Sequence, residues 1–256
     1  KKITNSFSFL FGDYSVLQVI EELKKIEEEK IRLHLLRIWI DKNYSINDVD
    51  LVVDYAIETL ISNADKNTIN AAILNDFAKP LPYIRSKQKF YYLLAKFDTL
   101  KQSALEFGPT IDYVKFQLNL FRGEINFEID VAVNRLYEVL YFIDDIQNLS
   151  LNTDSLAVLY ASIKKNEVVL GSEIDFIEHV KNNLDLKIQK LINSTAHHFD
   201  VLGETIKLIS ISDYEYGLQI AEKLNTRVRR ERAIFEVFVG YLENPIENID
   251  LGIVDK

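Results

Sequence analysis

Residues Ser212 to Asn244 read SDYEYGLQIAEKLNTRVRRERAIFEVFVGYLEN, and this stretch decides the fold. It holds two amphipathic segments separated by the short break Asn225-Thr226. Ser212 or Asp213 is expected to cap the first helix, and Asn244-Pro245 to end the second, because proline cannot donate a helical hydrogen bond. The apolar positions recur at helical spacing: Tyr214, Leu218, Ala221 and Leu224 in the first segment, and Val228, Ile234, Phe235, Phe238, Tyr241 and Leu242 in the second. The stretch predicts a pair of helices, each of which needs a neighbour to bury its stripe.

A similar pattern occurs near the start of the chain. When residues 16–26 are laid over residues 217–227, four identical residues coincide: Leu17, Gln18, Glu21 and Leu23 with Leu218, Gln219, Glu222 and Leu224. After a slip of one residue, Arg32 falls on Arg232 and Ile46 on Ile246. Two remote stretches with the same order of helix, turn and helix predict two copies of one structural unit.

The composition favours an all-α protein. The chain has 256 residues, of which 48% are hydrophobic and 27% charged, as is typical of globular proteins. It contains only 8 glycines and 4 prolines, too few for the many hairpin turns of a sheet protein. We therefore expect long helices joined by short connections.

Charge and cysteine content exclude some classes of site. The net charge of −9 disfavours nucleic-acid binding, which needs a basic surface. The lack of cysteine excludes disulfides and thiolate metal sites, and it suits a reducing compartment, so a cytoplasmic location is expected. No apolar run approaches the roughly 18 residues of a membrane span.

Both ends of the sequence suggest a piece of a longer protein. There is no methionine, even at position 1, and a third helix is predicted to begin at Ile246 shortly before the last residue. The stripe that this helix would leave open predicts self-association through the C-terminal end.

Between the two pairs, the same periodicity predicts further helices, about a dozen in all, joined by short loops. Arg122-Gly123 is expected to end one of them with a C-terminal glycine, and Thr153 or Asp154 to cap another. No glycine- or serine-rich linker divides the chain, so residues 1–256 are predicted to form a single domain.

This succession of helical pairs resembles the α-solenoids, and its spacing is similar to tetratricopeptide and HEAT repeats. The tetratricopeptide signature is not met at its fixed positions, and the one tryptophan, Trp39, lies in a second helix. The resemblance implies a right-handed superhelix of antiparallel helical hairpins whose concave face holds a peptide or protein. Similar arrays also form the sensor parts of large signalling NTPases, which implies a scaffold or sensor role.

The densest charge feature is a run of arginines that forms the candidate ligand site, together with Tyr216. In a groove, guanidinium groups would hold carboxylates or phosphates. The alternative is that they form ion pairs with Glu222, Glu231 or an adjacent pair of helices. The run consists of Arg227, Arg229, Arg230 and Arg232.

Two other functions are considered as alternatives. Asp144-Asp145 resembles the aspartate-rich magnesium motif of terpenoid synthases, but Leu159 stands where the second motif of that family, begun by Asn152, needs a glutamate. His197-His198 is the only histidine pair, and adjacent helical histidines point about 100° apart, which does not suit one metal. The other alternative, a helical-repeat RNA binder, would need a basic groove.

Motifs for nucleotide hydrolysis, zinc proteolysis and serine catalysis are absent from the sequence. The sequence lacks the glycine-rich phosphate loops, the HExxH zinc motif and the GxSxG nucleophile motif. The sequence therefore favours a non-catalytic module without cofactors that binds a protein or peptide.

Overall fold

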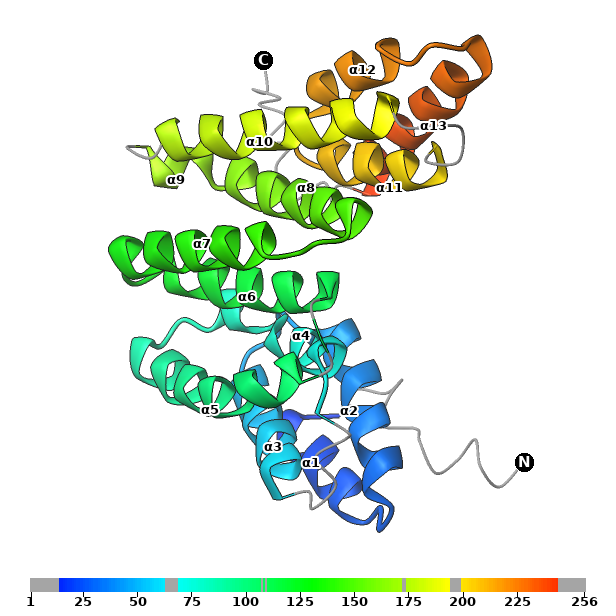
Figure 1. Cartoon of the computed structure of the whole chain (residues 1–256). Helices are drawn as coiled ribbons and strands as arrows, with labels where there is room; N and C mark the ends of the chain where they lie inside the picture. Colours follow the sequence, from blue (N-terminus) through cyan, green and yellow to red (C-terminus); the bar gives the residue numbers. More distant parts are fainter. Residues whose placement is uncertain are drawn as a thin grey trace, which may run out of the picture. The chain divides into compact units, whose positions relative to one another are not determined.

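Thirteen α-helices and one 3₁₀ helix make up the described part of the chain (Figure 1). The computed structural model describes residues 14–62, 69–106, 108, 110–171, 174–193 and 199–243, and no strand occurs among them. The all-α prediction is confirmed. None of these helices is both long and apolar enough to cross a membrane. The predicted third-helix start at Ile246 and the pair His197-His198 lie outside the described residues.

Contacts between the helices divide the chain into two compact units, Lys1–Tyr141 and Phe142–Lys256. The boundary falls inside helix α7 (Ile129–Asp144). The prediction of a single domain stays a prediction, because this division does not show whether either unit folds alone.

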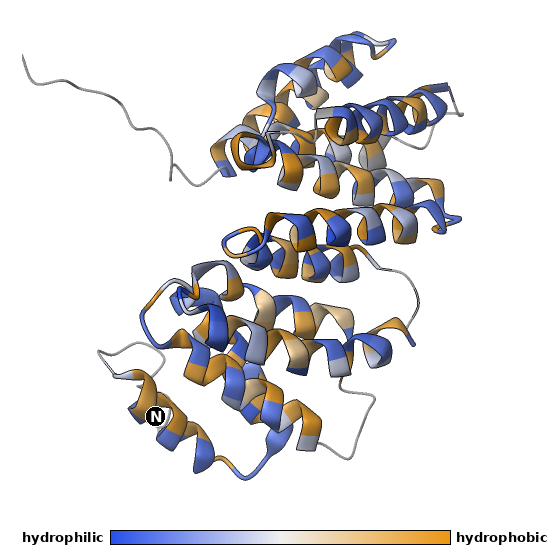
Figure 2. Cartoon of the chain, turned by 90° about the vertical axis from the view of Figure 1, so that its left-hand side faces the viewer, coloured by the Kyte–Doolittle hydropathy of each residue, from blue (hydrophilic) through white to orange (hydrophobic). Residues whose placement is uncertain are grey.

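In unit 1, helices contact both the next helix and the next but one. This unit contains α1 (Val16–Lys24), α2 (Glu29–Asn43), α3 (Val49–Ser62), α4 (Ala71–Ala78), the 3₁₀ helix η3 (Leu81–Tyr83), α5 (Lys87–Leu105), α6 (Ile111–Glu124) and most of α7. Alternate helices pack against each other: α1 on α3, α2 on α4, α3 on α5 and α4 on α6. Each helix is therefore held on two sides. Hydrophobic residues recur on one side of many helices, as Figure 2 shows.

Gly123 is helical rather than the predicted helix-ending residue, since α6 continues to Glu124. A Cβ atom at position 123 would come 2.2 Å from the ring of Phe90 in α5. The glycine is needed because α5 and α6 approach closely there, and this reason depends on a residue 33 positions earlier in the chain, so it is invisible to local patterns.

A buried ion pair joins α6 to α7 within unit 1. Arg135 donates from Nε to Glu124 Oε2 at 2.7 Å and from Nη2 to Oε1 at 2.6 Å, and its Nη1 donates to Gln117 at 2.8 Å. The Glu124 side chain is wholly buried. Burial raises the pKa of Glu124 despite the guanidinium beside it. Such a pair fixes how two helices fit together more than it adds stability.

Unit 2 is built around α8 and α11. It contains α8 (Leu149–Lys165), α9 (Glu167–Leu170), α10 (Ile174–Asn193), α11 (Phe199–Ser210), α12 (Tyr214–Glu222) and α13 (Arg227–Glu243). Helix α8 packs against α10 and α11, and α11 packs against α12 and α13. The predicted caps of α8, Thr153 and Asp154, are wrong: the cap is Asn148, five residues before Thr153, which accepts from the N–H of Leu151 at 3.0 Å.

Glycines let α11, α12 and α13 pack closely. A Cβ at Gly217 would lie 2.0 Å from Ser210 Oγ, and one at Gly240 would lie 2.3 Å from the carbonyl oxygen of Lys207. The backbone of α13 therefore meets the backbone of α11 at Gly240, and the backbone of α12 meets the Ser210 side chain at Gly217, so neither position has room for a side chain.

The two helical pairs noticed in the sequence do share one local geometry. Helices α1 and α12 are each 9 residues long, capped by Ser15 and Asp213, and equal connections (25–28 and 223–226) lead to α2 and α13. An arginine bonds a carbonyl in each connection: Arg32 donates to Ile26 O at 2.6 Å and Arg230 to Leu224 O at 3.1 Å.

The sequence alignment of the two pairs was nevertheless out of register. The caps pair Val16 with Tyr214, whereas the alignment had paired Val16 with Gly217. The alignment matched identical residues such as Leu17. This residue is 64% exposed, so its identity does not report which positions are packed.

Candidate functional site

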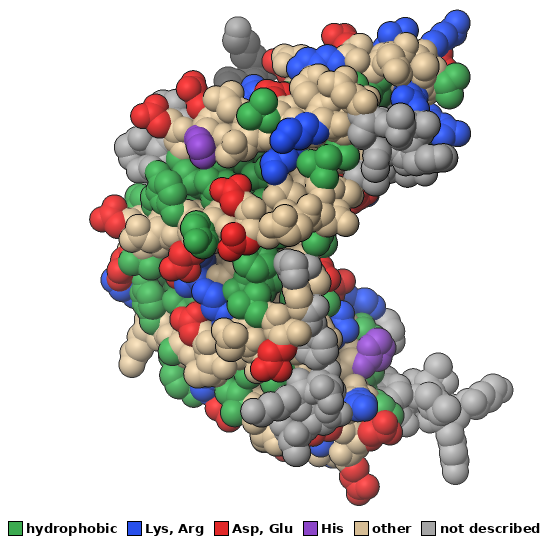
Figure 3. Space-filling view, viewed as in Figure 1, with side chains coloured by type: hydrophobic (Ala, Val, Ile, Leu, Met, Phe, Trp, Pro, Cys, Tyr) green, Lys and Arg blue, Asp and Glu red, His purple; other side chains and the backbone are tan. Residues whose placement is uncertain are grey.

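The four arginines at the start of α13 do not form one site. Arg227 pairs with Glu231 through Nε and Oε1 at 2.7 Å, Arg229 bonds Asn225 Oδ1 at 3.3 Å, and Arg230 bonds the carbonyl of Leu224. Because successive helical residues point about 100° apart, neighbouring arginines spread around the helix. Figure 3 shows basic side chains around the turn between α12 and α13. Arg232 lines a groove.

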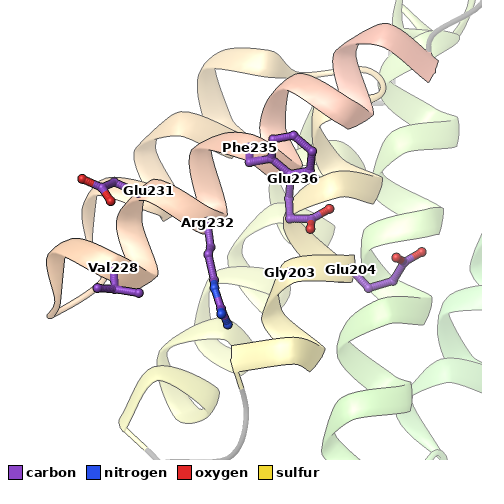
Figure 4. A pocket seen from close by; sticks show the side chains of 7 residues that line it. All are labelled: Gly203, Glu204, Val228, Glu231, Arg232, Phe235 and Glu236. Carbon is purple, nitrogen blue, oxygen red and sulfur yellow. The ribbon is translucent and has the colours of Figure 1, made fainter.

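This groove lies between α11 and α13 and has a volume of about 690 Å³. Figure 4 shows Arg232 and Glu236 extending from α13 on the side of α11, whereas Glu231 points away. On α11, Gly203 contributes no side chain, and this leaves room beside Glu204. The lining residues are Gly203, Glu204, Val228, Glu231, Arg232, Phe235 and Glu236.

The groove carries more negative than positive charge. Glu204, Glu231 and Glu236 line it together with Arg232. Glu231 is paired with Arg227, whereas Arg232 makes no ion pair within the described residues. Nearby, Lys207 donates to Glu243 at 2.8 Å, and this contact raises the pKa of Lys207, with smaller contributions from Glu204 and Glu236. The site suits a ligand with an apolar group and mixed or positive charge more than a phosphate.

Beside the groove, α13 exposes a broad apolar strip, which we call the outer face of α13. Its members are Val228 (63% exposed), Phe235 (64%), Phe238 (49%), Tyr241 (50%) and Leu242 (77%). On one flank, the ring of Tyr214 in α12 packs 6.1 Å from Phe238 and 5.4 Å from Tyr241. Soluble proteins rarely leave so many large apolar side chains together on one helix without a binding role.

The periodicity of the sequence predicts that α13 buries these large apolar residues, and this prediction is wrong. The buried residues of α13 are Ala233, Val237 and Gly240. The close approach of α11 leaves space only for small side chains on that face, so the large ones are displaced outward. Periodicity finds an apolar face, but it does not tell which of two apolar faces is covered.

Tyr216, the other predicted ligand residue, lies elsewhere. It is 2% exposed, and its hydroxyl donates to Asp185 Oδ1 at 3.0 Å. Its ring lies 5.3 Å from that of Tyr160, whose hydroxyl donates to Asp213 at 2.6 Å. Burial raises the pKa of both phenols. This cluster joins α8, α10 and α12, and it does not line the groove.

The acidic pair considered for magnesium is exposed at the end of α7. Asp144 and Asp145 line neither described groove. Asn152, which would begin a second metal motif, is buried and donates to the carbonyls of Ile143 and Ile146 at 2.7 and 3.2 Å. Among the described residues there is no group of three or more side chains able to hold a metal ion.

A second groove, of about 790 Å³, lies in unit 1 among the connections near the start of α3 and α5. Its charged residues include a pair, Lys89 and Asp50, whose Nζ and Oδ2 lie 2.7 Å apart, and Asn126 donates to Pro82 O at 2.9 Å. Asp48 adopts φ of 60° directly before α3, and this left-handed residue sets the start of the helix at Val49. These two contacts hold the connections together.

Comparison with known proteins gives no relative. No model of a protein family matches the sequence, and neither the curated proteins nor the solved structures provide a significant match. The function has to be argued from this chain's own surface.

Proposed function

We propose that this chain is a non-catalytic module that binds a protein segment at the groove between α11 and α13 and on the adjoining outer face of α13. The observation that carries the proposal is that outer face: five large apolar side chains exposed beside a groove with mixed charge. Apolar anchors surrounded by charged groups are the usual composition of protein-binding surfaces.

The packing of unit 1 supports the proposal of a tetratricopeptide-like or HEAT-like scaffold. In an α-solenoid each helical pair stacks on the next, so that helices contact their second neighbours. The contacts α1–α3, α2–α4, α3–α5 and α4–α6 follow this rule. The lack of cysteine fits a scaffold or sensor in a reducing compartment such as the cytoplasm.

Neither alternative has comparable support. The metal-diphosphate proposal would need further carboxylates facing Asp144 and Asp145. An RNA binder would need a basic groove, whereas the groove beside α13 is lined by three glutamates and one arginine.

The test is selection of peptides from a displayed library of random sequences of about 16 residues, long enough for four helical turns. Selected peptides should bind the unchanged chain and lose at least tenfold in affinity with Phe235→Asp, because a charge would replace the central apolar anchor. Leu17→Asp is the matched control, since Leu17 and Phe235 are both helical and both 64% exposed. Circular dichroism and thermal unfolding check that both variants are folded.

Two results would contradict the proposal. One is that no peptide is enriched above a selection against an unrelated helical protein. The other is that enriched peptides bind the Phe235→Asp and Leu17→Asp variants equally well, which would place binding elsewhere.

A further inference from the structure

The spacing on the outer face of α13 is that of a helix-pairing seam. Val228, Phe235 and Leu242 lie seven residues apart, and Phe238 lies three residues after Phe235. Apolar residues at this heptad spacing form a stripe along which a second helix packs. The exposed fractions of these four side chains, 49% to 77%, show that the described residues do not cover the stripe.

The first helical pair shows what covers the equivalent face. In α2, the positions that correspond to the four seam residues are Lys30, Arg37, Ile40 and Tyr44, of which Ile40 is buried, Arg37 and Tyr44 are partly buried and Lys30 is exposed. Helix α4 packs against α2, and Asp76 of α4 accepts from Arg37 Nε at 2.7 Å. The cover is a helix held by apolar contacts and an ion pair, so a helix is the occupant that this geometry fits.

The charge along α13 favours one orientation and one kind of partner. Residues 227–232 contain four arginines and one glutamate, whereas residues 236–243 contain two glutamates and neither lysine nor arginine. In an antiparallel pair of α13 helices, the basic half of each would lie against the acidic half of the other. A parallel pair would place like charges together.

Three of the four apolar positions are self-complementary in the same orientation. If a two-fold axis passes at Phe235, Val228 of one copy meets Leu242 of the second, whereas Phe238 meets Arg232. Arg227 of one copy meets Glu243 of the second, and each of these also has an ion pair within its own chain, with Glu231 and Lys207. Two-fold pairs use the same surface on both copies, so each contact occurs twice.

We propose that α13 packs antiparallel against α13 of a second copy of this chain, through Val228, Phe235, Phe238 and Leu242. The inference rests on the proposed function, because it names the occupant of the same surface.

The association is tested by sedimentation velocity between about 1 and about 100 µM, a range in which weak dimers respond to mass action. The unchanged chain should shift from monomer toward dimer as concentration rises, and Leu17→Asp should do the same. Phe235→Asp should raise the dimer dissociation constant at least tenfold. If the chain stays monomeric at every concentration, the proposal is overturned, whatever covers α13 in the monomer.

The orientation is tested by disulfide trapping, which is clean because the chain has no cysteine of its own. Val228→Cys and Leu242→Cys are prepared separately, one with a mass tag. In the antiparallel pair, the mixture should form the tagged–untagged disulfide much faster than either variant links to itself, since a disulfide needs Cα atoms within about 7 Å. Faster linking of each variant to itself would overturn the antiparallel pairing.

The two proposals fail in different ways. A monomeric chain whose selected peptides are lost on Phe235→Asp overturns the second-copy inference and leaves the proposed function standing. If the chain dimerises through α13, a selected peptide should lower the dimer fraction. A peptide that binds without changing the dimer fraction would overturn the claim that both use one surface.

Discussion

The pairs α1–α2 and α12–α13 have the same local geometry but a different relation to their surroundings. Both have a capped first helix, an equal connection and an arginine bonded to a carbonyl of that connection. The face of α2 that holds Leu33 and Ile40 is covered, whereas the corresponding face of α13 exposes Phe238. Caps and connections therefore determine the local geometry of each pair of helices, whereas the neighbouring helix determines which apolar residues are buried.

The largest expected effect tests whether residues on the two faces, of α2 and of α13, contribute differently to the free energy of unfolding. Ile40→Ala should lower the free energy of unfolding by about 3 kcal/mol, because it removes a wholly buried side chain and leaves a cavity. Phe238→Ala, at the equivalent position, should lower it by less than about 1 kcal/mol at concentrations where the chain is monomeric. Urea unfolding measures both. Similar losses at the two positions would mean that the outer face of α13 is covered in the monomer.

The second effect concerns the close packing found only beside α13. Gly240→Ala should destabilise the chain by about 2 kcal/mol, because its Cβ would overlap the carbonyl oxygen of Lys207. Gly203→Ala is the control: its Cβ would meet Glu236 at an ordinary 3.6 Å, and alanine favours a helix by up to about 1 kcal/mol. Thermal unfolding should show opposite shifts, and a neutral Gly240→Ala would show that the helices can move apart without loss.

The third effect uses the residue that α12 has and α1 lacks. Tyr216 occupies the position of Gln18, and burial raises the pKa of its phenol above the usual 10. Above pH 10 the unfolded chain releases this proton while the folded chain keeps it, so stability falls as the pH rises. The loss should be about 1.4 kcal/mol per pH unit from this group.

Tyr216→Phe should make the decline in unfolding free energy above pH 10 less steep, and Gln18→Ala should leave it unchanged. Urea titrations between pH 9 and about pH 11 measure the slopes. An unchanged slope in Tyr216→Phe would mean that the phenol ionises equally in both states.

The smallest effect tests what the two pairs share. Arg32→Ala should lower the free energy of unfolding by about 1 kcal/mol, because Nε and Nη2 both donate to Ile26 O. Arg230→Ala should lower it by about 0.5 kcal/mol, because the Arg230 side chain is more exposed and makes one such bond. Neither change should alter peptide binding. If Arg230→Ala abolished binding without loss of stability, Arg230 would be part of the ligand site after all.

The predictions that succeeded rest on local interactions. The predicted cap at Asp213 is one of them: its side-chain oxygen accepts from the N–H of Tyr216 at 2.9 Å at the start of α12. The alternative reading of the arginine run was also correct for Arg227, which pairs with Glu231 on its own helix. These interactions join residues within one helical turn, so their pattern is visible in the sequence.

The predictions that failed concern partners distant in the chain. Gly123 is predicted to end a helix, but it makes room for Phe90. Tyr216 is predicted to belong to the ligand site, but it is buried against Asp185. The groove itself needs Glu204 of α11 beside Arg232 of α13, which no spacing rule connects.

The sequence by itself determined the helices, the cap of α12 and the likeness of the two pairs, because these depend on hydrogen bonds and periodicity within a few residues. Only the tertiary structure decided which face of α13 is buried. The face with Ala233, Val237 and Gly240 lets the helices approach closely, and their close packing outweighs the larger apolar area of Phe235, Phe238 and Leu242. Those large side chains remain on the surface, where the proposed binding site lies.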